Sequence, residues 1–474
     1  MFDKFKEECG LVGVWNHKEA ANIAYLGLYA QQHRGQEGAG VVALDRGRSP
    51  AFSIHRGLGL VSDVFSDFKF SSLPGTAAIG HVRYTTAGGS KLANVQPFLA
   101  EISCGTAALA HNGNLINADI LKRELISRGA IFGSTSDTEV ILHLLARGNR
   151  NVLLTEIIIE ALKVIKGAFS LVMLFEDRLV AVRDPNGLRP LCLGRLGDAF
   201  VVASETCALD LVGAEYVRDI AGGELVEISG DGVVKSYFPF GMTRETPCVF
   251  EYVYFARPDS YIFGRNVYPV RYRMGEELAR EHPVDADLVV PVPDSGLTAA
   301  LGYSRASGIS IEMGLIRNHY VGRTFIEPLQ SIRDFGVKIK LNPNREILGG
   351  KRVIVIDDSI VRGTTSRKIV DMIRRAGASE IHMRISSPPT TDPCFYGIDT
   401  PSKEELIASR DDVEEIRKFI GADSLGYLSI EGLYKAVQAK PGKFCDACFT
   451  GQYPIGKPSQ YNGKKQLDIF GKDS

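Results

Sequence analysis

The sequence predicts a two-domain protein, in which an α+β sandwich is followed by an α/β domain built on a parallel sheet. Three observations favour this fold class: the length of 474 residues, a first half of short β-like runs between Gly-rich turns, and a second half in which buried strands alternate with helices. A single domain usually has about 100–150 residues, so the chain is too long for one core. The pattern changes between Ser229 and Pro247.

The first half carries a series of β-like runs. They are LVGVW, GVVAL, AAIGHVRYTT, AALAHNGNL, FSLVMLF, LVAVRD, AFVVASE and GELVEI. Helical periodicity lies between them, for example at Val140, Ile141, Leu144 and Leu145. Many strands with a few helices predict packed sheets with helices attached to them. We place this domain at residues 9–230.

The second half carries short apolar runs that lead into polar loops and then helices. DLVVPV, KRVIVI and SEIHMRI are such runs, and the helix after the second contains Ile369, Met372 and Ile373. This alternation is typical of a parallel sheet buried on both faces. We place this domain at residues 240–454 and treat 455–474 as a C-terminal tail, with weak order expected from about Gly451.

Composition and charge argue against several classes of function. A formal net charge of −1 gives no general attraction to nucleic acid or to an anionic membrane. No apolar run approaches the roughly 20 residues that span a bilayer, and the charged start MFDKFKEE does not look like a secretory signal. We therefore expect a cytoplasmic protein without nucleic-acid or membrane partners. Eight cysteines in such a chain favour thiols, metal ligands or nucleophiles over disulfides.

The segment VIVIDDSIVRGTT at residues 353–365 predicts a phosphoribose site. Asp357 and Asp358 follow a buried strand, at the edge where open α/β sheets bind ligands, and two adjacent carboxylates suit a ribose diol and Mg²⁺. Backbone N–H groups and small hydroxyls that suit a phosphate come next, from Ser359, Ile360, Val361, Arg362, Gly363, Thr364 and Thr365. Two aspartates alone would be read as a solvated turn that caps a helix. The complete string, however, resembles the phosphoribosyl diphosphate signature of type I phosphoribosyltransferases.

Two further segments belong to this site by the same resemblance. The loop VPDSG at residues 292–296 places Ser295 beside the two aspartates as a metal or diphosphate contact, although Asp-Ser is also a common helix cap. Residues 318–342 form a polar segment with several basic residues. A bland loop is one reading, but such a segment suits closure over a diphosphate leaving group and exclusion of water. Arg323 and Lys340 are the contacts expected there.

Cys9 and four polar segments point to a second reaction site. The segments are QQHRGQEGAG (31–40), GHVRYTTAGG (80–89), AHNGNL (110–115) and STSDTE (134–139), and each interrupts an apolar run, as functional groups at a sheet edge do. Alone, Cys9 would be read as a packed cysteine. Together these features resemble class II glutamine amidotransferases, whose N-terminal-nucleophile (Ntn) fold exposes cysteine as the first residue of the mature chain. For Arg34 we favour a positioning role over direct chemistry.

This second resemblance implies a role for each matching residue. Cys9 attacks the glutamine amide, and its freed α-amino group, which titrates near about 7.7–8.0, serves as general base. The chemistry therefore requires that residues 1–8 are removed as a propeptide. By the same resemblance, Asn112 and Gly113 stabilise the oxyanion. Arg83 holds the α-carboxylate of glutamine, and Asp137 holds its α-amine.

Four cysteines of the second half form the last motif. Cys248, Cys394, Cys445 and Cys448 could hold Zn²⁺ or an iron–sulfur cluster, and their spacing does not choose between them. Their surroundings, PCVFEYVYFARPDS, SSPPTTDPCFYGIDT and CDACFTGQYP, resemble the cluster-bearing branch of the amidophosphoribosyltransferase family. The resemblance implies a structural [4Fe-4S] cluster on these four residues. The remaining cysteines, Cys104, Cys192 and Cys207, are expected in apolar cores.

The resemblance to this family runs from Cys9 to about Pro454, with both signatures in the expected order. It implies an Ntn glutaminase sandwich followed by a type I phosphoribosyltransferase domain. The implied reaction transfers ammonia from glutamine to 5-phosphoribosyl 1-diphosphate with Mg²⁺, giving 5-phosphoribosylamine in the first committed step of purine biosynthesis. The resemblance also implies feedback inhibition by purine nucleotides and a homo-oligomer, either a dimer or a tetramer.

Three other kinds of protein share parts of this pattern. A regulator that only senses phosphoribosyl ligands would not need the glutaminase residues together, and the chain shows no basic recognition helix. An asparagine synthetase would need a loop such as SGGxDS, which the sequence lacks. A glucosamine synthase would lack VIVIDDSIVRGTT.

Overall fold

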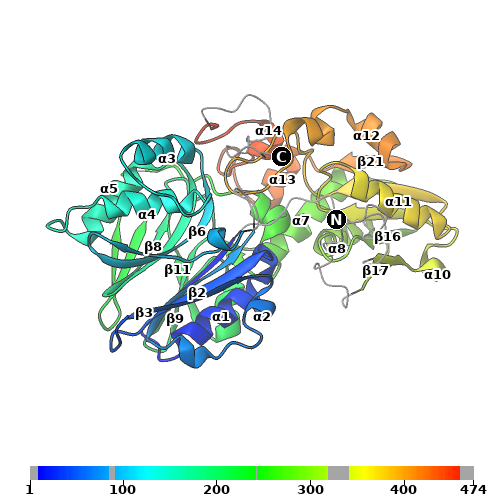
Figure 1. The fold of residues 1–474 in the computed structure, drawn as a ribbon. Coiled ribbons are helices and arrows are strands. Elements are labelled where there is room, and N and C mark those ends of the chain that lie inside the picture. Colours follow the sequence, from blue (N-terminus) through cyan, green and yellow to red (C-terminus); the bar gives the residue numbers. More distant parts are fainter. Residues whose placement is uncertain (1–8, 85–90, 242, 319–340, 459–474) are drawn as a thin grey trace, which may run out of the picture.

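The computed structural model describes residues 9–84, 91–241, 243–318 and 341–458. Two large antiparallel sheets make up the first half of the chain, and a four-stranded parallel sheet forms the centre of the second half. Figure 1 shows the halves side by side, with helix α7 (Val267–Glu281) and the C-terminal helix α14 (Ala447–Thr450) between them.

The two sheets of the first half contain thirteen strands. The seven-stranded sheet has the order β11 (Glu215–Asp219), β9 (Cys192–Leu196), β10 (Ala199–Ala203), β1 (Gly10–Trp15), β4 (Ala77–Arg83), β2 (Gly38–Leu44) and β3 (Phe52–Leu58). The six-stranded sheet has the order β13 (Val233–Tyr237), β12 (Leu225–Ser229), β8 (Arg178–Arg183), β7 (Gly167–Phe175), β6 (Gly105–Leu115) and β5 (Phe98–Ile102).

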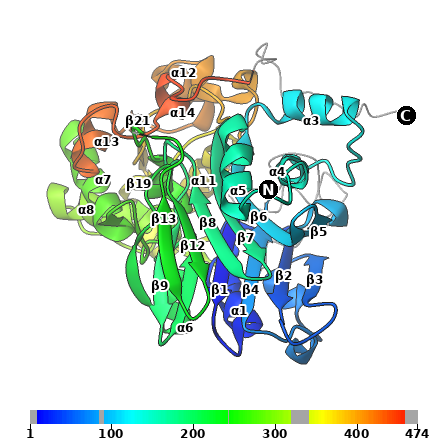
Figure 2. The same ribbon diagram turned by 90° about the vertical axis from the view of Figure 1, so that its left-hand side faces the viewer.

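Helices cover the outer face of each sheet, which makes four layers. Helices α1 (Ala20–Ala30) and α6 (Thr206–Val212) pack on the seven-stranded sheet. Three helices lie on the side of the six-stranded sheet: α3 (Ala118–Ser127), α4 (Thr138–Ala146) and α5 (Leu154–Val164) (Figure 2). Strand β1 shows how the layers form, because its side chains point alternately to the two faces of the sheet. Leu11 and Trp15 pack between the sheets, whereas Val12 and Val14 pack beneath α1. The predicted sandwich is confirmed.

Every predicted run of the first half contributes to a strand, but five strands lie outside those runs. Strands β3, β5, β11 and β13 are the edges of their sheets and are less buried than the central strands, so they lack the apolar signal of a buried strand. Strands β5 and β9 are short and carry polar residues in their second halves. The sequence pattern therefore finds the centres of the two sheets and misses their borders.

The parallel sheet has the strand order β16 (Leu288–Pro291), β19 (Arg352–Asp357), β20 (Glu380–Ile385) and β21 (Ser424–Tyr427). Helices α7 and α8 (Leu297–Ser307) cover one face, and α11 (Thr364–Arg375) and α12 (Val413–Ile420) cover the other. In β19, Ile354 and Ile356 face the first pair of helices, while Val353 and Val355 face the second pair. This double burial explains the continuous apolar run KRVIVI and confirms the predicted parallel sheet.

Short elements complete the second half. They are the π-helical turn η4 (Glu251–Phe255), the strand pairs β14 (Tyr261–Ile262) with β15 (Arg265–Asn266) and β17 (Leu315–Arg317) with β18 (Leu341–Pro343), and helices α10 (Arg345–Leu348) and α13 (Ile430–Ala436). In the first half, α2 spans Val61–Val64. None of the helices in the described ranges has the length and hydropathy that crossing a membrane requires.

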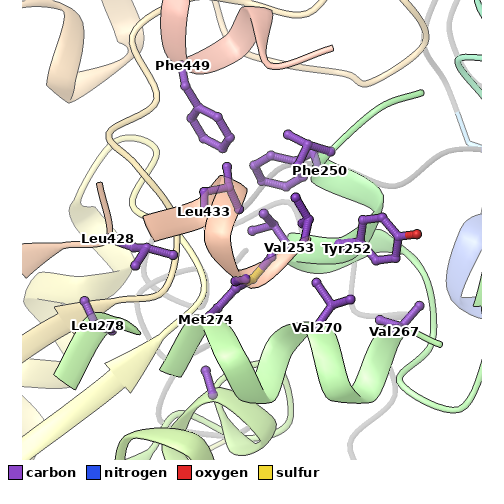
Figure 3. Packing of buried hydrophobic residues seen from close by; sticks show 14 of the residues in the cluster. Phe250, Tyr252, Val253, Val267, Val270, Met274, Leu278, Leu428, Leu433 and Phe449 are labelled. Atoms are coloured by element: carbon purple, nitrogen blue, oxygen red, sulfur yellow. The ribbon is translucent and has the colours of Figure 1, made fainter. Parts of the chain in front are cut away.

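The C-terminal part of the chain packs back onto the junction between the halves. Figure 3 shows Phe250 and Val253 of the junction close to Met274 of α7, Leu433 of α13 and Phe449 of α14. These residues belong to one buried cluster. Helices α13 and α14 are therefore held by the core of the second half.

The tail begins in an ordered way, although weak order was expected from about Gly451. The Tyr453 ring lies 5.0 Å from the ring centroid of Phe395 and 6.0 Å from that of Tyr396. Aromatic packing therefore fixes the start of the tail, a contact that sequence composition does not reveal. Residues 459–474 and residues 1–8 lie outside the described part of the chain, and the proposed domain limits stay predictions.

Candidate functional site

Cys9 lies immediately before β1, next to the end of β4. The pairing of Gly10 with Val82 places it beside Arg83, and its Sγ lies 3.8 Å from the carbonyl oxygen of Tyr84. Burial raises the pKa of the Cys9 thiol to about 11, against the effect of the Arg83 charge. At neutral pH the thiol is protonated, so a nearby base is needed to make it a nucleophile.

Arg83 provides a buried cation beside this thiol. It is 5% exposed, and burial lowers its pKa while the charges of Cys9 and Glu37 act in the opposite direction. The backbone around it is tightly packed, since a Cβ atom on Gly35 would lie 2.7 Å from the Arg83 nitrogen. The position suits a guanidinium that binds the carboxylate of a small substrate.

Asp137 provides a carboxylate near the same thiol, at the start of α4. Its Oδ2 accepts the N–H of Leu115 at 2.9 Å, and its Oδ1 lies 3.7 Å from His111 Nδ1. Although burial opposes it, the charge of His111 keeps the pKa of Asp137 below its usual value. Sequence reasoning missed His111, whose only signal is its place directly before Asn112. The site therefore contains a thiol, a cation and an ionised carboxylate.

Asn112 offers a free amide in this region. The residue is fully buried on β6, and among the described residues neither polar atom of its side chain has a hydrogen-bond partner. Leaving such a group unpaired costs roughly 1–3 kcal/mol, so the amide is suited to an incoming ligand. The preceding carbonyl, of His111, lies 3.1 Å from His81 Nε2 on β4, the strand that ends at Arg83. Asn112 thus belongs to the same end of the sandwich as Cys9.

Gly113 occupies a backbone conformation that only glycine adopts easily. Its φ is +142°, and a Cβ atom there would lie 2.1 Å from the Ala168 carbonyl oxygen. The segment AHNGNL belongs to the predicted run AALAHNGNL, and it lies on strand β6 as that run predicts. Pairing of β6 with β7 continues in register through Asn112, Gly113 and Asn114, so these polar residues are held within the sheet.

Asp357 and Asp358 lie together at the carboxyl end of β19 and are each 1% exposed. The Asp358 N–H donates to Asp357 Oδ1 at 2.9 Å, and Ser359 Oγ donates to Asp358 Oδ2 at 2.6 Å. From the neighbouring strand end, Ser295 Oγ lies 3.4 Å from Asp357 Oδ1. The structure therefore brings together the two strand-end loops that the sequence suggested.

The loop after the aspartates is anchored by its apolar residues. Ile360 and Val361 are 2% and 1% exposed and pack in the cores on opposite faces of the sheet, so only their backbone can face a ligand. Arg362 forms an ion pair with Glu405 at 3.0 Å. Gly363, with a φ of +78°, turns the chain into α11. This arrangement presents successive N–H groups at a helix start, which suits a phosphate.

The remaining residues predicted for this site divide into two groups. Thr364 and Thr365 form the first turn of α11, the first exposed and the second buried. Arg323 and Lys340 lie outside the described residues. The covering role of the segment 318–342 therefore stays a prediction.

The four cysteines of the second half lie in one buried region. The residues on either side of Cys248 form backbone hydrogen bonds with Cys445 at 2.9 and 3.1 Å, and Cys394 Sγ accepts the N–H of Tyr396 at 3.3 Å. Burial raises the pKa of Cys248 to about 11 and those of Cys445 and Cys448 well above the usual value, and the charges of the neighbouring cysteines add to this. Thiolates are the donor type that both Zn²⁺ and an iron–sulfur cluster prefer.

Across the described residues, which include these four cysteines, no three His, Cys, Asp or Glu side chains are placed to hold a metal ion. The cysteines are therefore neighbours in the fold without standing in a ligating arrangement, and their role as ligands stays a prediction. Cys192 is buried and Cys104 partly buried against apolar clusters, as expected. Cys207 is also buried, but its Sγ lies 3.8 Å from Glu205 Oε2, so its surroundings are not purely apolar.

Comparisons with known proteins agree on one family. Residues 83–211 match the family described as "Glutamine amidotransferase domain". The amidophosphoribosyltransferase of Bacillus subtilis is 52% identical over 453 residues, which is 94% of each chain. The chloroplastic amidophosphoribosyltransferase 2 of Arabidopsis thaliana is 52% identical over 470 residues, covering 99% of this chain and 83% of its own.

A solved structure shares the complete fold. The glutamine phosphoribosylpyrophosphate amidotransferase of B. subtilis, in complex with ADP and GMP, superposes with a TM-score of 0.89 at 50% identity. The match covers 95% of this chain and 98% of the other. The similarity therefore includes both halves and their arrangement.

Proposed function

The chain belongs to the amidophosphoribosyltransferase family, whose reaction is the first step of purine biosynthesis, and on this premise we propose how its residues divide the work. Cys9 frees ammonia from glutamine, and residues 353–365 hold the phosphoribosyl diphosphate that receives it. The observation that carries the proposal is the presence of two buried polar centres in one chain. One combines a thiol, a cation, a carboxylate and an unpaired amide, and the other is a pair of aspartates at a parallel-sheet edge.

The glutamine reaction begins once residues 1–8 have been removed. The freed α-amine of Cys9 takes the thiol proton, and the sulfur attacks the amide carbon. The Asn112 amide and the Gly113 N–H stabilise the oxyanion, while Arg83 and Asp137 hold the α-carboxylate and α-amine. The proton then passes to the departing ammonia, and water hydrolyses the thioester to glutamate.

The phosphoribosyl reaction uses the ammonia at the edge of the parallel sheet. Asp357 and Asp358 bind the ribose diol, and the backbone from Ser359 to Thr365 holds the 5-phosphate. Ser295 and the two aspartates would hold Mg²⁺, which would supply positive charge to neutralise the diphosphate leaving group. Ammonia attacks C1 of the ribose and diphosphate departs. Arg323 and Lys340 are proposed to cover the leaving group and exclude water.

Asn112→Ala should lower kcat for glutamine hydrolysis by about 10²–10³-fold, with a small change in KM. The amide is proposed to act on charge that exists only in the transition state. Steady-state glutamate release at varied glutamine concentration measures both constants. Asn186→Ala, a turn residue outside the site, is the control and should be close to wild type. A large rise in KM with unchanged kcat would instead assign Asn112 to substrate binding.

The four cysteines are proposed to hold a [4Fe-4S] cluster that clamps the end of the chain to the junction. Anaerobically purified protein should contain about four iron and four acid-labile sulfide atoms per chain. Cys448→Ser should lower both contents and the thermal stability, because the binding free energy of such a group adds to the free energy of folding. Zinc without sulfide would contradict the cluster and would indicate a structural zinc site on these cysteines.

The proposal extends to regulation and assembly. The related B. subtilis structure was solved with ADP and GMP, and we propose that purine nucleotides inhibit this chain as well. We also propose a homo-oligomer and a cytoplasmic location, although the Arabidopsis relative is named as chloroplastic. The protein with glutamine, phosphoribosyl diphosphate and Mg²⁺ should release glutamate and diphosphate in equal amounts. A protein that only senses these ligands would release neither.

A further inference from the structure

A loop that carries one of the four cysteines lies directly against the glutamine site. This cysteine loop comprises residues 394–397. The side-chain amide of Asn114 donates to the Phe395 carbonyl at 2.9 Å, and a Cβ atom on Gly397 would lie 2.9 Å from the Gly113 Cα. Gly397 has a φ of +111°. The backbone of Gly113, proposed to stabilise the oxyanion, therefore rests on a segment from the other half of the chain.

Arg189 fixes the middle of this loop. It follows β8 in the first half and is fully buried. Its Nε and Nη2 both donate to the Tyr396 carbonyl, at 2.9 and 2.6 Å. Two N–H donors of one guanidinium on a single carbonyl hold it in both distance and direction. Arg189 thus connects the first half of the chain with the residues between Cys394 and Gly397.

A chain of buried ion pairs holds Arg189 from its other side. Its Nη1 lies 3.5 Å from Glu251 Oε1, and Glu251 Oε2 lies 2.6 Å from Arg34 Nη2. Arg34 also pairs with Glu205, and its Cβ would lie 3.5 Å from a Cβ atom on Gly10, the neighbour of Cys9. All four ionic side chains are at most 1% exposed.

The four-cysteine region is connected to the same guanidinium. Tyr396, whose carbonyl receives the Arg189 guanidinium, also donates its N–H to Cys394 Sγ at 3.3 Å. Burying ion pairs adds little net stability on average, so a contribution to stability alone does not account for this chain of charges. The ion pairs fix the positions of Cys394, the cysteine loop and the glutamine site relative to one another.

We propose that Arg189 is a positioning residue that presses the cysteine loop against Gly113 and so makes the four-cysteine group a support of the oxyanion site. The inference rests on the proposed roles of Cys9, Gly113 and the cysteines. Arg189 touches no substrate. It acts through the Tyr396 carbonyl and the contact between Gly397 and Gly113, and Glu251 with Arg34 keeps its guanidinium oriented.

The test compares five variants of the full-length protein, purified without oxygen. Arg189→Met and Gly397→Ala each disturb the loop, the first by removing its anchor and the second by adding a carbon against Gly113. Each should lower kcat for glutamine hydrolysis about tenfold or more, with KM changed less than about threefold, because the oxyanion exists only in the transition state. Synthesis from added ammonia should be unchanged, and iron should leave Arg189→Met faster in air than the wild type.

Two controls match these changes. Arg195→Met removes an exposed arginine of β9, and Gly105→Ala places a side chain at a similar φ of +115° with nothing within 4 Å of its Cβ. Both should behave like wild type. Arg189→Lys, which keeps the charge and one donor, should recover part of the lost kcat. Should Arg189→Met fail to fold, Gly397→Ala and Arg189→Lys decide the question by the same criteria.

Several results would overturn the inference. They are a kcat within about twofold of wild type in both loop variants, an equal loss in the Gly105→Ala control, a parallel loss of ammonia-dependent synthesis, or equal iron loss in Arg189→Met and wild type. Failure of the proposed function looks different, because the wild type itself would then hydrolyse no glutamine or contain no iron.

Discussion

Replacing Cys9 with alanine is expected to abolish synthesis from glutamine while leaving synthesis from ammonia intact. The sulfur forms the proposed covalent bond to glutamine, and loss of a nucleophile lowers kcat by at least about a thousandfold. The aspartate pair, by contrast, belongs to the other half of the chain, at the carboxyl end of β19. Added ammonia therefore bypasses the missing thiol. Diphosphate release measured with glutamine and then with ammonium chloride checks both halves of this expectation.

Cys104→Ala serves as the control, because Cys104 is a partly buried cysteine of the same half that the proposal does not use. It should keep both activities. The separation of the two sites is wrong if Cys9→Ala also loses ammonia-dependent synthesis in a protein that remains folded. The nucleophile assignment is wrong if glutamine-dependent synthesis persists.

Replacing Asp357 and Asp358 together with asparagine should remove phosphoribosylamine formation from either nitrogen source, by at least about a hundredfold. Both carboxylates are buried at the strand end, and asparagine keeps their shape while removing the charges proposed to bind the diol and Mg²⁺. The glutaminase site is untouched, so a basal release of glutamate should continue. Parallel assays of diphosphate and glutamate measure this uncoupling.

Asp371→Asn is the matched control, since Asp371 lies exposed on α11 and pairs only with Arg375 among the contacts described for it. It should resemble wild type in both assays. Phosphoribosylamine formation at the normal rate in the double variant would reject the diol assignment. Complete loss of basal glutaminase would show instead that the two sites are not separable.

The sequence predicts the parts of this molecule whose signal is local. The run KRVIVI is apolar throughout because β19 is buried on both faces, and DDSIVRGTT reads as a ligand loop because its residues are neighbours in the chain. Even there the structure adds a division of roles, since Ile360 and Val361 anchor the loop in two cores. Edge strands such as β13 are not predicted, because their exposed residues carry no apolar pattern.

The contacts between distant segments could not be predicted in the same way. Arg189 carries no motif, whereas Glu251 and Tyr396 lie in the segments around Cys248 and Cys394. The contact between Arg189 and Tyr396 appears only when the fold brings residues about two hundred positions apart into hydrogen-bond distance. Arg34 illustrates the middle case. A positioning role was favoured from its sequence context, and the structure places it in buried ion pairs with Glu205 and Glu251.

The central claim is that Cys9 becomes both nucleophile and base, and the mass of the mature chain tests it most directly. The Cys9 thiol, with its pKa raised to about 11, needs a base, and its own α-amine is available only after residues 1–8 are gone. Intact-mass analysis of fully active protein should therefore show a chain that begins at Cys9. A fully active chain that still carries residues 1–8 would contradict the account.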